Sequence, residues 1–267
     1  MWHLLFVLQF LGLISTAAGS VGSQITTTQV KLGDSIINVT KELFPLPKQS
    51  SIEYAFLNLH ENENTSIVAA RAFLYQNGGS LVRFSHGSSR LISFYLQNVK
   101  YSFDPNRMFT SEGIDSTLKQ YGPYSTSAAN EVANFASNVL NIYEFSKQSL
   151  VLALHNNAGS YGASSYLPGG PYEDDASAVY IEPKTNPSDF YYVVDPQYFD
   201  WFADNGFNVV LQNNETVTND GSLSYYCGLQ SKSYINFESL AEYSSYGAQV
   251  VIQLDMLYAV RDMLTNL

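Results

Sequence analysis

The run LVLAL at residues 150–154 is the feature that most constrains the fold of this chain. It is continuously apolar, which is typical of a central strand that is buried on both faces of a sheet. A second run, IEYAFLNL at residues 52–59, is rich in aromatic and branched residues and contains no strand breaker. Strands of this kind need helices on both sides of their sheet, so the two runs favour an α/β fold.

Helical patterns alternate with the strand patterns. In residues 127–145 the apolar positions recur at helical spacing, and three further helices are predicted at 65–76, 196–206 and 245–265. Shorter strands are predicted at 80–84, 91–97, 100–103, 178–183, 207–212, 223–228 and 234–237. This alternation predicts a three-layer α/β/α domain with a mixed, mostly parallel central sheet.

The first residues of the chain suggest an exported protein. Residues 1–19 contain a short apolar run followed by small residues, which is typical of a secretory signal peptide. We expect an irregular N-terminal arm at 20–50 and a single catalytic domain at 51–267. The mature protein is then secreted and free of the membrane. Sequons occur at Asn38, Asn64 and Asn214, and whether they are glycosylated is left open, as is the oligomeric state.

Composition excludes some classes of partner. The formal net charge of −11 disfavours nucleic acids and anionic membrane surfaces, which both attract basic proteins. With 45% apolar residues, the chain can bury a sizeable core. Its single cysteine, Cys227, can form no disulfide within the chain, and we interpret it as a small buried residue.

Polar residues follow several of the predicted strands at the point where each strand ends. These residues are His60, His155, the Asn106–Arg107 pair and Glu238. In open α/β sheets, ligands bind at the carboxyl ends of the strands, so we expect these side chains to share one crevice.

His60 and Glu63 lie three residues apart in the segment HENE. One interpretation is a helix cap beside an exposed imidazole. The other is a metal site, in which a single strand-to-helix turn presents both side chains and His155 is the third ligand. Two imidazoles and a carboxylate with one open position form the ligand set of a catalytic zinc site.

The segments HENE, DPNRMF and LHNN, taken in this order, resemble the zinc carboxypeptidase superfamily, in particular its aspartoacylase and succinylglutamate desuccinylase branch. The resemblance covers about residues 52–160. It implies that His60, Glu63 and His155 bind zinc and that Asn106 and Arg107 hold a substrate carboxylate.

The chain departs from the motifs of that branch in three ways. Ala153-Leu154 stands where an aspartate usually precedes the histidine of the third motif, so a drier site is expected. Glu61 replaces a glycine and is expected to crowd the turn and add negative charge. The general base is usually followed by a Gly-Pro pair, which this chain lacks. Glu238 is the best candidate for the base, with Glu242 and Glu215 as fallbacks.

Together these features predict a secreted zinc-dependent hydrolase that cleaves a peptide or N-acyl amide bond in a small carboxylate-bearing substrate. The alternative is a non-catalytic descendant of the same fold that binds a peptide or glycan through the Tyr-rich loop at 156–175. Glu238 discriminates between the two, because hydrolysis requires a base and binding does not.

Overall fold

The computed structural model describes residues 22–48, 52–241 and 245–267. The expected signal peptide and the fallback base Glu242 lie outside these residues. Within the described part of the chain, no helix is both long and apolar enough to cross a bilayer.

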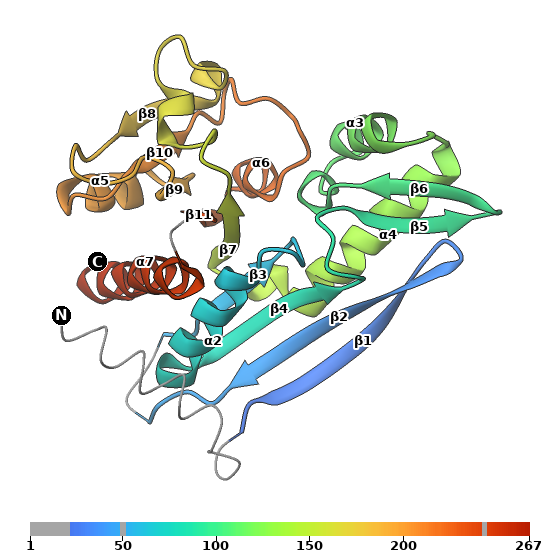
Figure 1. Cartoon of the computed structure of the whole chain (residues 1–267), viewed down its shortest axis with the longest axis horizontal. Helices are drawn as coiled ribbons and strands as arrows, with labels where there is room; N and C mark the ends of the chain where they lie inside the picture. The colour runs from blue at the N-terminus through green and yellow to red at the C-terminus, as the bar shows by residue number, and fades with distance from the viewer. Residues whose placement is uncertain (1–21, 49–51, 242–244) are drawn as a thin grey trace.

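Nine strands of the described chain form one mixed sheet, in the spatial order β1-β2-β4-β3-β7-β11-β9-β10-β8 (Figure 1). The four central strands β4, β3, β7 and β11 run parallel, whereas the pairs at both margins are mainly antiparallel. The strand bounds are β1 Gln24–Leu32, β2 Ser35–Phe44, β3 Ala55–Asn58, β4 Gly79–Ser85, β7 Leu150–Asn157, β8 Ala176–Tyr180, β9 Phe190–Val193, β10 Val209–Gln212 and β11 Ser233–Leu240. A separate hairpin consists of β5 (Ile92–Leu96) and β6 (Val99–Phe103).

Helices cover both faces of the sheet. Along β7, Leu152 and Leu154 pack in one core cluster, whereas Val151 and Ala153 pack in the other. The first cluster contains side chains of α2, α5 and α7, and the second contains side chains of α3, α4 and α6. The helix bounds are α2 Asn64–Asn77, α3 Ser111–Tyr121, α4 Thr126–Tyr143, α5 Pro196–Asp204, α6 Leu223–Leu229 and α7 Tyr246–Asn266. The predicted three-layer α/β/α class and the parallel centre of its sheet are confirmed.

The N-terminal segment differs from the prediction. Residues expected to form an irregular arm instead form the long antiparallel hairpin β1–β2, which joins the main sheet through β4 (Figure 1). The prediction was wrong because β1 is an edge strand whose first six residues are all exposed, so the strand shows no apolar alternation. The turn is made by Gly33, whose φ of +60° suits glycine.

The strand predicted at 223–228 is wrong as well, because this segment forms helix α6. Ser222 caps this helix by accepting a hydrogen bond from the Tyr225 N–H. Leu223 and Cys227, four residues apart, form its buried face. Aromatic residues gave the segment a strand-like composition, but the Ser222 cap and the four-residue spacing of the buried residues are typical of a helix. Cys227 is buried, as predicted, and burial raises the pKa of its thiol.

Candidate metal centre

Two parallel neighbours, β3 and β7, bring His60 and His155 together. Asn58 pairs with Leu154, so His60, two residues beyond the end of β3, lies at the same edge of the sheet as His155. Glu63 is the residue that precedes helix α2. The loop between β3 and α2 therefore presents His60 and Glu63 toward the end of β7, as the sequence predicted.

The three side chains converge closely. Glu63 Oε1 lies 2.8 Å from His60 Nδ1, and Glu63 Oε2 lies 3.2 Å from His155 Nδ1. The two Nδ1 atoms are 3.1 Å apart. His60, Glu63 and His155 are all buried, and each offers one ligand atom within 4.8 Å of the others. Within the described residues, this is the one His/Cys/Asp/Glu group with such a spacing.

The helix-cap interpretation does not fit this geometry. Glu63 makes no side-chain capping hydrogen bond to α2, and His60 is 0% exposed. The Glu63 carboxylate faces the two histidines instead. The segment HENE therefore ends its strand with a buried His–Glu–His cluster.

Asp104 orients His60 from the far side of the imidazole ring. His60 Nε2 lies 2.8 Å from Asp104 Oδ1, and when Nε2 donates this hydrogen bond, Nδ1 is left as a lone-pair ligand. Burial lowers the pKa of His60, but the carboxylates of Glu63 and Asp104 outweigh it and raise the pKa to about 9. Burial raises the pKa of Asp104, and the contact with His60 and the charge of Arg90 more than reverse this.

The cluster fits a metal ion better than it fits a set of hydrogen bonds. Buried Glu63 Oε2 and His155 Nε2 have no hydrogen-bond partner, although the first lies close to His155. The two Nδ1 atoms lie 3.1 Å apart, near the edge of about 3.3 Å of a tetrahedron with ligands at about 2.0 Å. One Glu63 oxygen lies 2.8 Å from the first Nδ1, and the other oxygen lies 3.2 Å from the second. Burial raises the pKa of Glu63, yet the two histidines hold it far below its usual range, so the carboxylate is charged.

Arg90 is the cation of this site, and the sequence reasoning missed it. Its two terminal nitrogens lie 3.1 Å from Glu63 Oε1 and 3.2 Å from Asp104 Oδ2. Its side chain is 49% exposed and lines a cavity of about 460 Å³ together with Glu63 and Asn157. The signal was available, because Arg90 follows the carboxyl end of β4, a parallel neighbour of β3.

Glu238 lies on β11 directly beside His155 on β7, in parallel register. Neighbouring strands are about 4.8 Å apart, and residues paired in this way project from the same face. Its carboxylate accepts hydrogen bonds from Asn236 Nδ2 at 3.0 Å and from Asn157 Nδ2 at 3.3 Å. Glu238 is 7% exposed, and burial raises its pKa, against the attraction of His155.

Of the two other candidates for the base, the structure describes Glu215 alone. Glu215 is exposed and follows β10, and its backbone N–H donates to Asn213 Oδ1. Glu242 lies outside the described residues.

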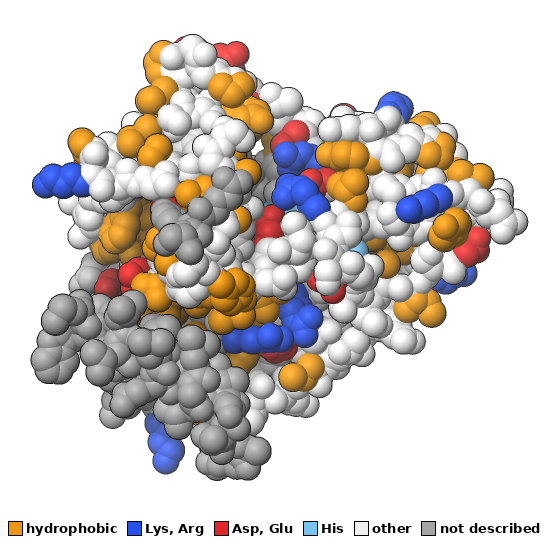
Figure 2. Space-filling model, in the orientation of Figure 1, with side chains coloured by type: hydrophobic (Ala, Val, Ile, Leu, Met, Phe, Trp, Pro, Cys, Tyr) orange, Lys and Arg blue, Asp and Glu red, His pale blue; other side chains and the backbone are white. Residues whose placement is uncertain are grey.

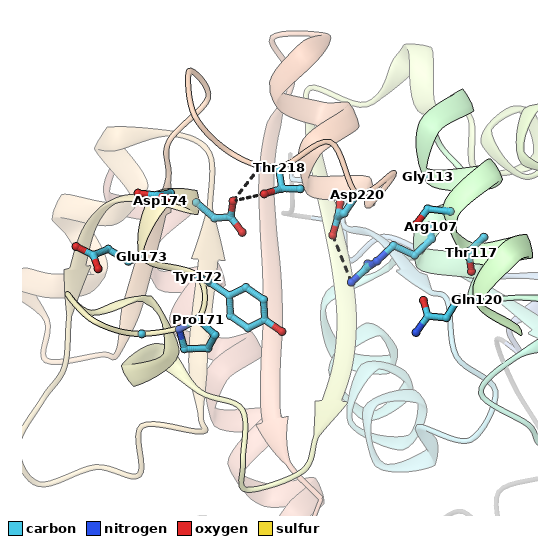
Figure 3. A pocket seen from close by; sticks show the side chains of 13 residues that line it. Arg107, Gly113, Thr117, Gln120, Pro171, Tyr172, Glu173, Asp174, Thr218 and Asp220 are labelled. Atoms are coloured by element: carbon cyan, nitrogen blue, oxygen red, sulfur yellow. Dashed lines mark hydrogen bonds and ion pairs between the residues drawn. The ribbon is translucent and has the colours of Figure 1, made fainter.

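Asn106 and Arg107 lie next to the cluster and not in the cavity that contains Glu63. Asn106 Oδ1 accepts a hydrogen bond from the Leu223 N–H at 3.0 Å, which caps α6. Arg107 is paired with Asp220 at 3.3 Å and lines a second cavity, of about 500 Å³, opposite Tyr172 (Figure 3). Thr117, which also lines this cavity, accepts a hydrogen bond from the Asp104 N–H. Asn106 and Arg107 therefore flank the cluster from the side of Asp104, and their role in substrate binding stays a prediction.

The surface near the middle of the molecule carries both signs of charge. Figure 2 shows Lys or Arg side chains next to Asp or Glu side chains there, with no broad area of one sign on this face. This mixture suits a ligand that carries charged groups more than it suits a polyanion.

Comparison with known proteins gives similarity at the level of structure. No family model matches the chain, and no curated protein matches it. The product-bound ectoine utilization protein EutE (DoeB) from Ruegeria pomeroyi matches with a TM-score of 0.46 and 12% identity, over 91% of this chain and 68% of that one. A succinylglutamate desuccinylase/aspartoacylase from Rhodobacter sphaeroides matches with a TM-score of 0.44 and 11% identity, over 91% of this chain and 66% of that one. The second protein carries the name of the branch that the sequence motifs resemble. The chemistry inferred for the site rests on this chain's own residues.

Proposed function

We propose that this protein is a zinc-dependent hydrolase that cleaves a peptide or N-acyl amide bond in a small substrate bearing a carboxylate. The observation that carries the proposal is the convergence of His60, Glu63 and His155, all buried, with Glu63 Oε2 and His155 Nε2 left without a hydrogen-bond partner. Two histidines and one carboxylate leave a tetrahedral ion one open position, as catalytic zinc sites do.

The protein's own groups prepare the centre. His60, Glu63 and His155 would hold the ion, and Asp104 would keep His60 in the tautomer that binds through Nδ1. A bound zinc ion supplies Lewis acidity that activates water and polarises the scissile carbonyl.

Glu238 acts as the general base. Its place beside His155 lets its carboxylate take a proton from the attacking water and later deliver that proton to the leaving amine. Burial raises its pKa, which improves a carboxylate as a base near neutral pH. Asn157 and Asn236 fix the orientation of the carboxylate.

Arg90 stabilises negative charge on the reacting substrate. It holds Glu63 and Asp104 with one donor from each terminal nitrogen, and its exposed side chain leaves further donors for a ligand in the adjoining cavity. A guanidinium placed in this way suits an oxygen on which charge develops. Arg107, in the second cavity, is proposed to bind the substrate carboxylate.

A binding module of the same fold is the competing function, and Glu238 favours hydrolysis over it. A protein that only binds a peptide or glycan has no need of a buried carboxylate beside a metal ligand. The expected export of the protein stays a prediction, because residues 1–19 lie outside the described part of the chain.

The test is hydrolysis of N-acyl amino acids and short peptides by the purified protein, before and after chelation, with metal content measured in parallel. Each substrate is paired with its C-terminal amide. We expect zinc-dependent cleavage with a preference for the free carboxylate over the amide. We expect Arg107→Ala to remove this preference. A zinc-loaded protein that binds these compounds and cleaves none of them would establish the binding function instead.

A further inference from the structure

Glu61 is the residue of the segment HENE that the proposed function leaves without a role. It was expected to crowd the turn between β3 and α2, but its side chain leaves that turn. Its Oε2 accepts hydrogen bonds from the His86 N–H at 2.6 Å and from the Ser88 N–H at 2.9 Å. Glu61 thus connects the metal-binding turn to the loop that follows β4.

The backbone of that loop is shaped to receive an anion. Gly87 has a φ of +113° and Ser88 a φ of +57°, both in the left-handed region. Such a conformation turns nearby N–H groups toward one concave side, which binds anions. The carboxylate of Glu61 occupies this position from within the chain, and charge-assisted hydrogen bonds of this kind are among the strong ones.

The loop also carries Arg90. Gly87, Ser88 and Ser89 are all exposed, so burial contributes little to holding this segment in place. Arg90 follows Ser88 by two residues and reaches back to Glu63 and Asp104. One short stretch of chain therefore contacts Glu61 through its backbone and Glu63 through its arginine.

We propose that Glu61 is a positioning residue that fixes the 86–88 turn, so that Arg90 presents its remaining guanidinium donors to the substrate beside Glu63. The proposal rests on the role assigned to Arg90 in the proposed function. A glycine at this position would have no side chain that could reach the turn.

A double-mutant cycle between Glu61 and Arg90 tests the coupling. We expect Glu61→Gly to lower kcat/KM about tenfold, since small displacements of a binding group are costly, and Glu61→Gln to retain most of the activity. In an Arg90→Ala background, Glu61→Gly should lower kcat/KM less than about twofold. Equal losses in both backgrounds would overturn the proposal. Zinc content should not change in any of these variants.

A matched control is Asp34→Ala. Asp34 Oδ2 accepts a hydrogen bond from the Gln97 N–H at 2.9 Å, in the β5–β6 turn, where Gln97 and Asn98 also have positive φ. This contact has the same chemistry away from the site. We expect Asp34→Ala to leave kcat/KM unchanged.

A second measurement needs no activity. An arginine-selective dicarbonyl reagent, read by mass spectrometry, reports how firmly Arg90 is held. We expect Glu61→Gly to speed the modification of Arg90 several-fold and to leave the modification of Arg83 unchanged. We expect Asp34→Ala to change neither rate. An unchanged rate at Arg90 would overturn the proposal whether or not the protein proves to be a hydrolase. Faster modification in a protein without hydrolase activity would retain the positioning and reject the proposed function alone.

Discussion

Two clusters of charged side chains, each with a buried carboxylate, lie along this sheet, and they differ in how their charges are satisfied. In the first, Glu42 on β2 is 2% exposed and accepts hydrogen bonds from Arg71 Nε, Arg71 Nη2 and Arg83 Nε at 2.6 to 2.8 Å. In the second, His60, Glu63 and His155 converge and leave two buried atoms, Glu63 Oε2 and His155 Nε2, without a hydrogen-bond partner.

The difference teaches how a structural cluster can be distinguished from a functional one. Buried charges are tolerated when they are paired and hydrogen-bonded, and the Glu42 cluster meets that condition within the protein. The His60 cluster meets it only in part, because Glu63 Oε2 and His155 Nε2 are left without a hydrogen-bond partner. The first cluster should therefore affect stability alone, and the second should affect metal binding and catalysis.

The largest expected effect is the loss of the metal. Glu63→Gln should abolish zinc binding and lower turnover by at least about 10³-fold, because the ion contributes several kcal/mol to the transition state. Added zinc should raise the Tm of the wild type and of Glu42→Gln, but not that of Glu63→Gln. Calorimetry with and without zinc checks this. A zinc-dependent Tm shift that survives in Glu63→Gln would remove this residue from the site.

The next effect concerns the base. Glu238→Gln keeps the shape of the side chain but removes its ability to take a proton, so turnover should fall by about 10²-fold or more while zinc is retained. Steady-state kinetics and metal analysis of the same preparation measure both quantities. Full activity of Glu238→Gln together with an inactive Glu242→Gln would assign the base to Glu242.

Breaking the paired cluster should act on stability alone. Glu42→Gln leaves Arg71 and Arg83 without their shared carboxylate and should lower the free energy of unfolding by about 3 kcal/mol, with kcat unchanged in the folded protein. Urea denaturation measures the difference. Glu144→Gln is the control, since Glu144 pairs with Lys41 and Lys147 at a more exposed position and should cost less than about 1 kcal/mol. Equal losses in the two variants would contradict the account of Glu42.

The stabilisation by Glu42 should also depend on pH. Burial raises its pKa, but Arg71 and Arg83 outweigh burial and lower it below the value of about 4.3 found in unfolded chains. The contribution is therefore present above pH of about 4.3 and is lost as pH falls through the folded pKa. Between pH 6 and pH 3, the wild type should lose more stability than Glu42→Gln does. Parallel losses would show that Glu42 does not titrate in this way.

The smallest effect concerns the orientation of a ligand. Asp104→Asn keeps a hydrogen-bonding side chain beside His60 but removes its charge, and should weaken zinc binding about tenfold. Competition with a chelator of known affinity measures the change. An unchanged zinc affinity would mean that Asp104 serves only the packing around His60.

The sequence predicted that His60 and His155 lie together because the rule that places them is simple. His60 and His155 each follow a strongly apolar strand, and the carboxyl ends of parallel strands meet at one edge of a sheet. The same rule found Glu238. It did not find Arg90, because Arg90 lies five residues beyond the end of β4, in an irregular loop that Glu61 contacts from outside.

The remaining differences have similar causes. The β1–β2 hairpin was missed because an exposed edge strand needs no apolar alternation. Arg107 follows a strand end, as predicted, but its side chain turns to Asp220 and the second cavity. Spacing along the chain gives the position of a backbone, whereas the direction of a long side chain is set by partners distant in sequence.

The central claim is that the His60 cluster binds a zinc ion, and a crystal structure of the zinc-loaded protein tests it most directly. Diffraction data collected on both sides of the zinc absorption edge locate the ion without any assumption about activity. The account predicts one anomalous peak about 2 Å from His60, Glu63 and His155, with Asp104 still bonded to His60. A zinc peak elsewhere, with these three side chains bonded only to one another, would contradict it.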